Sequence, residues 1–220
     1  MTLYLDTADR DAWADLMPVG LFRGITTNPL LAARAGLDYP KIDWAGMAAL
    51  ARDLGATELH AQVYGPTEGY VDWAGALYEA GHRAGIETVV KIPLVAAAIR
   101  ETPAIKALGG RILMTACYDA KQMFVARALQ ADFIAPYFGR MAEAGIDAMA
   151  HLATMARMNA GLGKPCTILI ASLRSTDQMV ALADAGHDCF TISPDIARGL
   201  LSSEHSIAAH EAFEATIGRG

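Results

Sequence analysis

The chain has 220 residues, 53% of them hydrophobic, and a formal net charge of -6 at pH 7. That length allows a substantial core within one domain spanning residues 1–220. No stretch approaches the roughly 18 uninterrupted apolar residues of a membrane span. The N-terminus carries acids where a signal peptide carries bases, so we expect a cytoplasmic protein. The basic residues are scattered, which argues against nucleic acid or an anionic membrane as partner.

Cysteines and histidines give no sign of a metal or a disulfide framework. Cys117, Cys166 and Cys189 are an odd set, far apart and each within an apolar run, which indicates reduced core residues. No pair of histidines has metal-ligand spacing together with a carboxylate. We therefore expect no metal in the chemistry of this protein.

Short apolar segments alternate with helix-like segments along the whole chain, the pattern of a parallel sheet covered by helices. The amphipathic stretches 69–85 and 176–186 each close at a glycine just before the next strand. No G-x-G-x-x-G follows the first strand, which disfavours a dinucleotide-binding sheet. We predict a single α/β domain with the (β/α)8 TIM barrel fold rather than an open doubly wound sheet. The predicted strands are residues 3–7, 24–28, 58–65, 87–93, 111–118, 131–138, 165–172 and 189–194.

The last segment, 202–220, is predicted to be an amphipathic C-terminal helix. Ile207, Ala208, Phe213 and Ile217 are available for one apolar face. That face can cover the helix's own barrel or the surface of a neighbouring subunit.

Polar residues gather where the predicted strands end, and TIM barrels place catalysis at that face. Side chains two apart on a strand share a face, so Thr26 and Asn28 point the same way. The candidate site residues, in chain order, are Asp6, Thr26, Asn28, Gln62, Lys91, Thr115, Tyr137, Arg140, Ser172 and Arg174.

Lys91 stands in the middle of "ETVVKIP", a run that otherwise predicts a strand buried on both faces. One interpretation is structural: the amine extends past Pro93 to water or pairs with Asp6. The other is chemical, because low-dielectric surroundings lower the pKa of an ammonium and leave neutral amine to attack a carbonyl. The resulting iminium is the electron sink that carbon-carbon cleavage next to a ketone requires.

Schiff-base chemistry also needs a group that moves protons and a positioned water. Tyr137, Gln62 and Thr115 are the candidates to hold that water, although a core tyrosine or a backbone-paired glutamine explains the first two equally well. His60 shares the strand face of Gln62 one layer deeper and is expected to be a core residue.

Arg140 and Arg174 close predicted strands beside Tyr137 and Ser172, on the late loops that frequently bind phosphate in these barrels. A guanidinium offers such a group paired hydrogen bonds. Surface charge is the alternative role for both.

With these residues assembled, the chain resembles the small transaldolase family, and within it the fructose-6-phosphate aldolases. The resemblance runs in order from residue 3 to about residue 200. The stretches that carry it are "LYLDTAD", "GITTNP", "AQV", "VVKIP", "TACY", "IAPYFGR", "ASLRS" and "ISPDIA".

The resemblance implies that Lys91 forms the Schiff base, with Asp6 and Asn28 hydrogen-bonding near it and to substrate hydroxyls. It also implies that Arg140, Ser172 and Arg174 hold a phosphate, and that no metal or organic cofactor is needed. Similar proteins are homo-oligomers, often decamers of two pentamers in which the C-terminal helix reaches onto a neighbour. The substrates implied are small sugar phosphates and aldehydes.

Two positions separate the activities within the family that the chain resembles. Transaldolases similar to it carry glutamate at the position of Gln62 and phenylalanine at that of Tyr137, whereas the aldolases carry glutamine and tyrosine. The chain is therefore expected to be a Schiff-base aldolase that cleaves or forms fructose 6-phosphate. A true transaldolase and a non-catalytic barrel that binds sugar phosphates are the alternatives.

Overall fold

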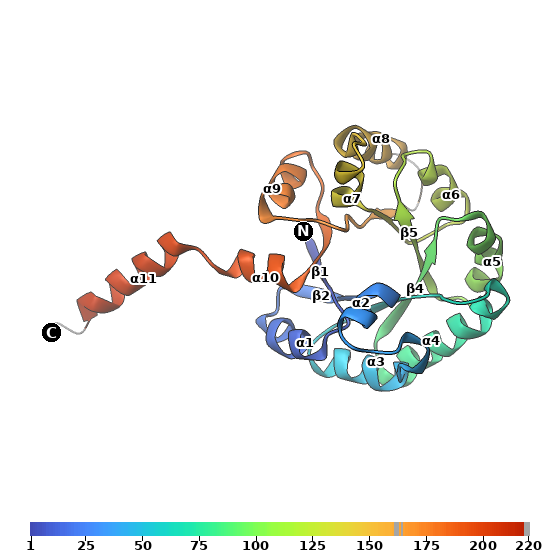
Figure 1. The fold of residues 1–220 in the computed structure, drawn as a ribbon, viewed down its shortest axis with the longest axis horizontal. Helices are drawn as coiled ribbons and strands as arrows, with labels where there is room; N and C mark the ends of the chain where they lie inside the picture. Colours follow the sequence, from blue (N-terminus) through green and yellow to red (C-terminus); the bar gives the residue numbers. More distant parts are fainter. Residues whose placement is uncertain (161–162, 164, 218–220) are drawn as a thin grey trace.

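The computed structural model describes residues 1–160, 163 and 165–217, in which parallel strands and helices alternate as predicted (Figure 1). The strands are β1 Thr2–Asp6, β2 Phe22–Thr26, β3 Glu58–Gln62, β4 Glu87–Pro93, β5 Arg111–Cys117, β6 Phe133–Pro136, β7 Thr167–Ile168 and β8 Cys189–Ile192. The α-helices are α1 Arg10–Leu16, α2 Pro29–Arg34, α3 Trp44–Asp53, α4 Tyr70–Ala84, α5 Ala96–Ala107, α6 Gln122–Ala128, α7 Phe138–Glu143, α8 Ala148–Asn159, α9 Thr176–Asp184, α10 Pro194–Leu201 and α11 Glu204–Ile217. Short 3-10 helices lie at Met17–Val19, Tyr39–Lys41 and Thr67–Gly69.

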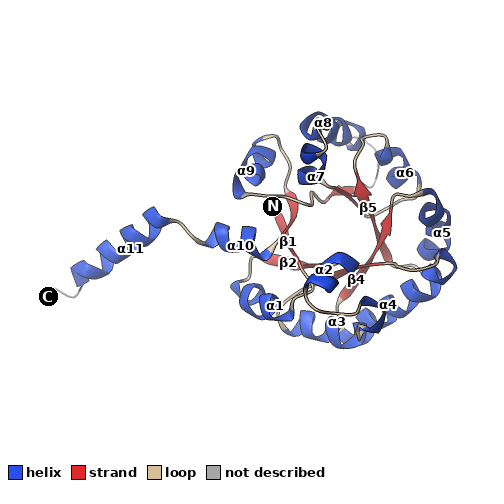
Figure 2. Ribbon diagram, in the orientation of Figure 1, coloured by secondary structure: helices blue, strands red, loops and turns tan. Residues whose placement is uncertain are grey.

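The eight parallel strands form a closed barrel, which confirms the predicted fold. Their order is β7-β6-β5-β4-β3-β2-β1-β8, and a parallel bridge between Ile170 and Phe190 joins the two ends of the series. Two backbone hydrogen bonds complete this junction, from Ile170 N to Cys189 O at 3.0 Å and from Thr191 N to Ile170 O at 2.9 Å. Figure 2 shows the strands as an inner ring surrounded by helices.

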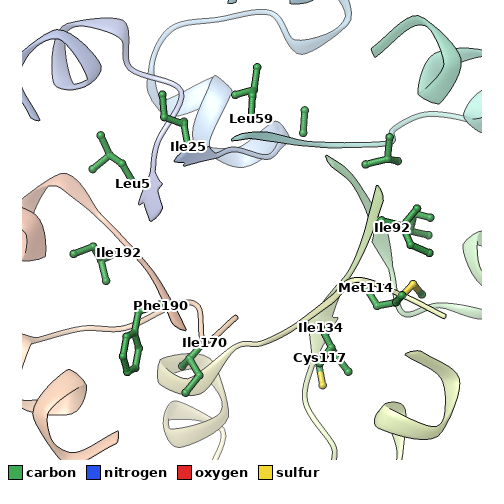
Figure 3. Packing of buried hydrophobic residues seen from close by; sticks show 14 of the residues in the cluster. Leu5, Ile25, Leu59, Ile92, Met114, Cys117, Ile134, Ile170, Phe190 and Ile192 are labelled. Atoms are coloured by element: carbon green, nitrogen blue, oxygen red, sulfur yellow. The ribbon is translucent and has the colours of Figure 1, made fainter. Parts of the chain in front are cut away.

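Alternate residues of each strand face opposite sides of the barrel wall, as a two-residue period requires. The outward set, which includes Leu5, Ile25 and Ile92, packs against the surrounding helices in the main hydrophobic cluster (Figure 3). A second, smaller cluster fills the barrel interior with Tyr4, Val89, Leu113, Phe133, Ala135, Leu169, Ala171 and Cys189. The interior is therefore a packed core whose polar residues are confined to its two ends.

The N-terminal end of the barrel is closed around the buried carboxylate of Glu58. It accepts hydrogen bonds from Tyr4 (2.8 Å), Arg23 (2.7 Å) and Arg111 (3.0 Å), and His60 Nε2 lies 2.9 Å from it. Burial by itself raises the pKa of Glu58, but the hydrogen bonds from His60, Tyr4 and Arg23 hold it well below its usual range. Burial lowers the pKa of His60 to about 4, so its ring is neutral at pH 7. His60 is thus a core residue, as expected.

Helix α11 extends away from the barrel (Figure 1), and none of its residues is buried. Its apolar side chains Ile207, Phe213 and Ile217 are 51%, 67% and 74% exposed. Among the described residues, no helix is long and apolar enough to cross a membrane. The barrel and its C-terminal helix are therefore distinct parts of the described chain.

Candidate functional site

A cavity of about 110 Å³ opens at the C-terminal end of the barrel strands. Nine of the ten predicted site residues line it, and Gln62 is the exception. The lining residues that the sequence predicted are Asp6, Thr26, Asn28, Lys91, Thr115, Tyr137, Arg140, Ser172 and Arg174. The cavity is called the mouth cavity below.

Lys91 lies in the middle of β4, and its side chain enters the mouth cavity from the barrel wall. The residue is only 5% exposed, and its Nζ has no hydrogen-bond or ion-pair partner among the residues that the structure describes. Burial lowers the pKa of Lys91 below its usual range, and the nearby charge of Asp6 offsets part of that effect. The structural interpretation of Lys91 therefore does not hold: its side chain lies in the mouth cavity rather than in bulk water past Pro93, and it forms no ion pair with Asp6 in the described structure.

The carboxylate of Asp6 is held in place by two threonines from neighbouring strands. Thr26 Oγ1 donates to Asp6 Oδ1 at 2.6 Å, and Thr26 Oγ1 also lies 2.6 Å from Thr191 Oγ1. Because a hydroxyl has one proton and Thr26 gives it to Asp6, Thr191 is the donor of the second bond. This relay across β1, β2 and β8 fixes the carboxylate of Asp6, the one carboxylate among the described residues that line the mouth cavity.

Two hydroxyls face each other on the opposite wall, where Thr115 Oγ1 and Tyr137 Oη are 2.9 Å apart. Burial raises the pKa of Tyr137, so the phenol keeps its proton and can donate it. Thr115 precedes Ala116, whose positive φ of 57° marks an irregularity in the pairing of β5 with β6. Such a bulge re-aims the neighbouring side chains.

Gln62 ends β3 beside Lys91 in the strand register, yet it is absent from the lining of the mouth cavity. Its backbone is anchored from outside, because Tyr39 Oη donates to Gln62 O (2.7 Å) and accepts from Gln62 N (2.8 Å). Its half-buried side-chain amide has no hydrogen-bond partner among the described residues. The amide is therefore unengaged at the rim.

The region after β6 differs from the sequence-based prediction. The strand ends at Pro136, Tyr137 joins Ala171 through an isolated bridge, and Arg140 lies in helix α7. Gly139 allows this early turn into a helix, because a Cβ there would lie 2.1 Å from the carbonyl oxygen of Ser172. Gly139 N instead donates to that oxygen at 3.0 Å.

Ser172, predicted as the last residue of a strand, lies beyond the regular strand β7, as does Arg174. Ser172 adopts a positive φ of 63°, a strained conformation for a residue with a side chain. Its Oγ is buried and has no hydrogen-bond partner among the residues that the structure describes. Arg174 is exposed, and its Nε donates to Glu143 Oε1 at 2.7 Å.

The structure adds cavity residues that were not among the predicted site residues: Leu30, Leu31 and Arg34 from α2, Thr191 in β8, and Ser193 directly after β8. Thr191 could have been found from strand alternation, because it lies two residues before Ser193 at a strand end. Asn28, predicted on a strand, is the N-cap of α2, where its Oδ1 accepts from Leu31 N at 3.0 Å. Its amide NH2 remains free to donate.

This arrangement combines a desolvated amine, a fixed carboxylate and a protonated phenol, with guanidinium groups at the rim. No cluster of three or more His, Cys, Asp or Glu side chains suited to a metal ion occurs within residues 1–160, 163 and 165–217. The groups present can do amine-based covalent chemistry on a carbonyl compound.

The sequence pattern of the transaldolase/fructose-6-phosphate aldolase family matches residues 3–218, nearly the whole chain. The chain belongs to this family. It is therefore an enzyme of the transaldolase type. A protein of Phenylobacterium zucineum described as a probable transaldolase is 31% identical over 91% of this chain and 88% of its own length. Another probable transaldolase, from Jannaschia sp. (strain CCS1), is 28% identical over 98% of this chain and 95% of its own.

Solved structures support the fold alone. The tryptophan synthase alpha-subunit of Pyrococcus furiosus superimposes with a TM-score of 0.61 at 14% identity, covering 90% of this chain and 88% of that one. A structure described as native KDPGal gives a TM-score of 0.56 at 13% identity, covering 87% and 81%.

Proposed function

We propose that this family member is a cofactor-independent Schiff-base aldolase that cleaves or forms fructose 6-phosphate. The observation that carries the proposal is the state of Lys91, which is 5% exposed, has no partner among the described residues and opens into the mouth cavity. An ammonium in that position is disfavoured, so part of the population is the neutral, nucleophilic amine.

The reaction begins when Nζ of Lys91 adds to the C2 ketone of the sugar. The carbinolamine loses water, for which Tyr137 supplies a proton, and an iminium results. The C3–C4 bond then breaks as its electrons pass into the iminium, while Asp6 or a water takes the proton of the C4 hydroxyl. Glyceraldehyde 3-phosphate leaves, and the enamine is protonated at C3 and hydrolysed to dihydroxyacetone, which regenerates the amine.

Tyr137 is the proposed proton donor because it is protonated at neutral pH and faces Thr115 at 2.9 Å. We also propose that Gln62 helps to hold the water between them. This last role requires the unengaged amide of Gln62 to turn into the mouth cavity, since the residue does not line that cavity in the structure.

We assign the sugar phosphate to Arg140 and to Ser172, whose buried Oγ has no partner in the described part of the chain. The backbone contact between Gly139 and Ser172 brings the start of α7 against this serine. Arg174 is a weaker candidate, since Glu143 already occupies its guanidinium. Asn28 and Thr26 complete the proposed substrate contacts on the opposite wall.

A borohydride test decides whether Lys91 is the nucleophile. Reduction in the presence of dihydroxyacetone is expected to add a three-carbon adduct to the Lys91 peptide, and the Lys121→Arg variant serves as a control for an exposed lysine. An unmodified Lys91 peptide would refute the mechanism. Binding of fructose 6-phosphate without trapping would favour a non-catalytic sugar-phosphate barrel instead.

The second candidate is a true transaldolase, which the descriptions of the two relatives favour. It would transfer the dihydroxyacetone unit from fructose 6-phosphate or sedoheptulose 7-phosphate to erythrose 4-phosphate, as in the pentose phosphate pathway. Product analysis with and without the acceptor separates the two activities, because an aldolase releases free dihydroxyacetone in its absence.

We further propose that the protein is a homo-oligomer, with a decamer of two pentamers as one such arrangement, in which α11 packs on a neighbouring subunit. The exposed apolar side chains of α11 support this arrangement, and the three buried free cysteines fit the cytoplasm that we propose as its compartment. Light scattering of a chain truncated after Leu201 tests the role of α11. If the truncated chain forms an oligomer with the same number of subunits, α11 does not hold the subunits together.

A further inference from the structure

Helix α2 presents one face to the mouth cavity. Leu30, Leu31 and Arg34 all line it, and residues three or four apart on a helix share a side. Figure 1 shows α2 in front of the barrel strands, inside the ring formed by the outer helices. Arg34 is therefore directed at the cavity by the geometry of its helix.

The guanidinium of Arg34 differs from the other two in the mouth cavity because it has no hydrogen bond, ion pair or ring contact among the described residues, whereas each of the other two has at least one such contact. Arg174 is paired with Glu143, and the guanidinium of Arg140 lies 5.0 Å from the ring centre of Tyr137. Arg34 is exposed to the cavity and has no hydrogen bond or ion pair with any residue that the structure describes. Such a group is available to an anionic ligand.

The backbone that carries Arg34 is anchored on both sides, at the start of α2 and in the segment after it. Asn28 caps the start of α2. The segment that follows is tied to the barrel by the two hydrogen bonds between Tyr39 Oη and the backbone of Gln62. The ring of Tyr39 also packs edge-on against Trp44 and Tyr64, each at a centroid distance of 5.3 Å. This anchoring lowers the entropy lost when the cavity binds a ligand.

Arg34 approaches the cavity from the side opposite to Arg140. In the ring order of the eight strands, β2 and β6 stand four places apart, and α2 follows β2 while α7 follows β6. Only one carboxylate, Asp6, lines the cavity in the described part of the chain. The lining carries an excess of positive charge on both sides, which suits a phosphate dianion.

We propose that Arg34 is a specificity-determining residue that contacts the phosphate monoester of a phosphorylated donor or acceptor sugar from the side opposite to Arg140 and Ser172. This inference rests on the proposed function, because it assigns part of the substrate recognition in the same cavity. A guanidinium is suited to phosphate by its paired donors.

The test compares Arg34→Gln with Arg34→Lys and with Arg100→Gln, which alters an exposed helical arginine of α5 that also lacks a partner in the described structure. Calorimetry measures the Kd of inorganic phosphate for each variant. Steady-state assays then measure KM for fructose 6-phosphate and for erythrose 4-phosphate as acceptor, and borohydride trapping measures the half-saturating concentration of unphosphorylated dihydroxyacetone.

Arg34→Gln is expected to weaken phosphate binding and to raise KM for at least one phosphorylated sugar by about five- to ten-fold, the upper part of the range for the net loss of one ordinary hydrogen bond, because solvent weakens a charged contact at an exposed site. The rise identifies whether donor or acceptor carries the recognised phosphate. Arg34→Lys should recover part of the loss, and Arg100→Gln should match the wild type.

Equal effects of Arg34→Gln on phosphorylated and unphosphorylated compounds, or no effect on either, would overturn the inference. Failure of the proposed function is recognised separately, because it would leave Lys91 untrapped in the wild type. The phosphate Kd values still decide the role of Arg34 in that case.

Discussion

Replacing Lys91 by methionine is expected to stabilise the protein at pH 7 while abolishing Schiff-base formation. Methionine has nearly the length of the lysine stem and no charge, and Lys91 is 5% exposed without a partner in the described structure. Burying an unpaired ion costs several kcal/mol after relaxation. Because Nζ opens into the mouth cavity and Asp6 offsets part of the cost, we expect a gain of about 1 to 3 kcal/mol.

The stabilisation of the protein by Lys91→Met should decrease as pH rises. The pKa of Lys91 is lowered in the folded protein, so the unfolded chain binds more protons between that value and about 10.4, the ordinary lysine pKa. Wild-type stability therefore has a component that rises with pH through this window. Lys91→Met lacks the component, so the difference between the two proteins should shrink as pH approaches about 10.

Thermal unfolding followed by circular dichroism from pH 6 to 10 measures this difference. For a chain of this size, 1 kcal/mol corresponds to about 2 to 4 °C in Tm. Lys121→Met is the matched control, because the side chain of Lys121 is 77% exposed, and it should stay within about 0.5 kcal/mol of the wild type. A destabilised Lys91→Met, or a difference that does not change with pH, would refute the reasoning.

Three further predictions concern the proton donor, the closed end of the barrel and the turn before Arg140. Tyr137→Phe should lower kcat for fructose 6-phosphate cleavage by about 100-fold or more, whereas Thr115→Ser keeps a hydroxyl and should lose little; equal losses would mean that the donor is misassigned. Glu58→Gln should lower the free energy of unfolding by about 2 to 4 kcal/mol in urea titrations, since it removes the charge that Arg23 and Arg111 share; an unchanged midpoint would contradict this. Gly139→Ala should displace Ser172, because the carbonyl oxygen of Ser172 would lie 2.1 Å from the added Cβ. The variant should raise KM for fructose 6-phosphate several-fold more than it raises the half-saturating concentration of dihydroxyacetone in borohydride trapping. An equal rise in both quantities would argue against Ser172 as a phosphate contact.

The sequence by itself determined the barrel, its order of elements and the buried lysine at its mouth. Hydrophobic periods of two and of three to four residues are local properties, so they mark strands and helices before any tertiary contact is known. A lysine inside an apolar strand, such as Lys91, can also be recognised from the local sequence alone. The parallel alternation then places the strand ends, with Asp6, Thr26 and Thr115, at one mouth.

Only the tertiary structure decided which polar groups meet and which are already satisfied. Glu143 lies 31 residues from Arg174 in the chain, and no sequence pattern predicts that it pairs with that guanidinium. Arg34 carries no motif, and it enters the cavity because α2 folds over the barrel. Gln62 was predicted from its strand face, yet the side chain lies outside the cavity lining. Such pairings depend on distances between segments remote in sequence, and a local pattern does not contain them.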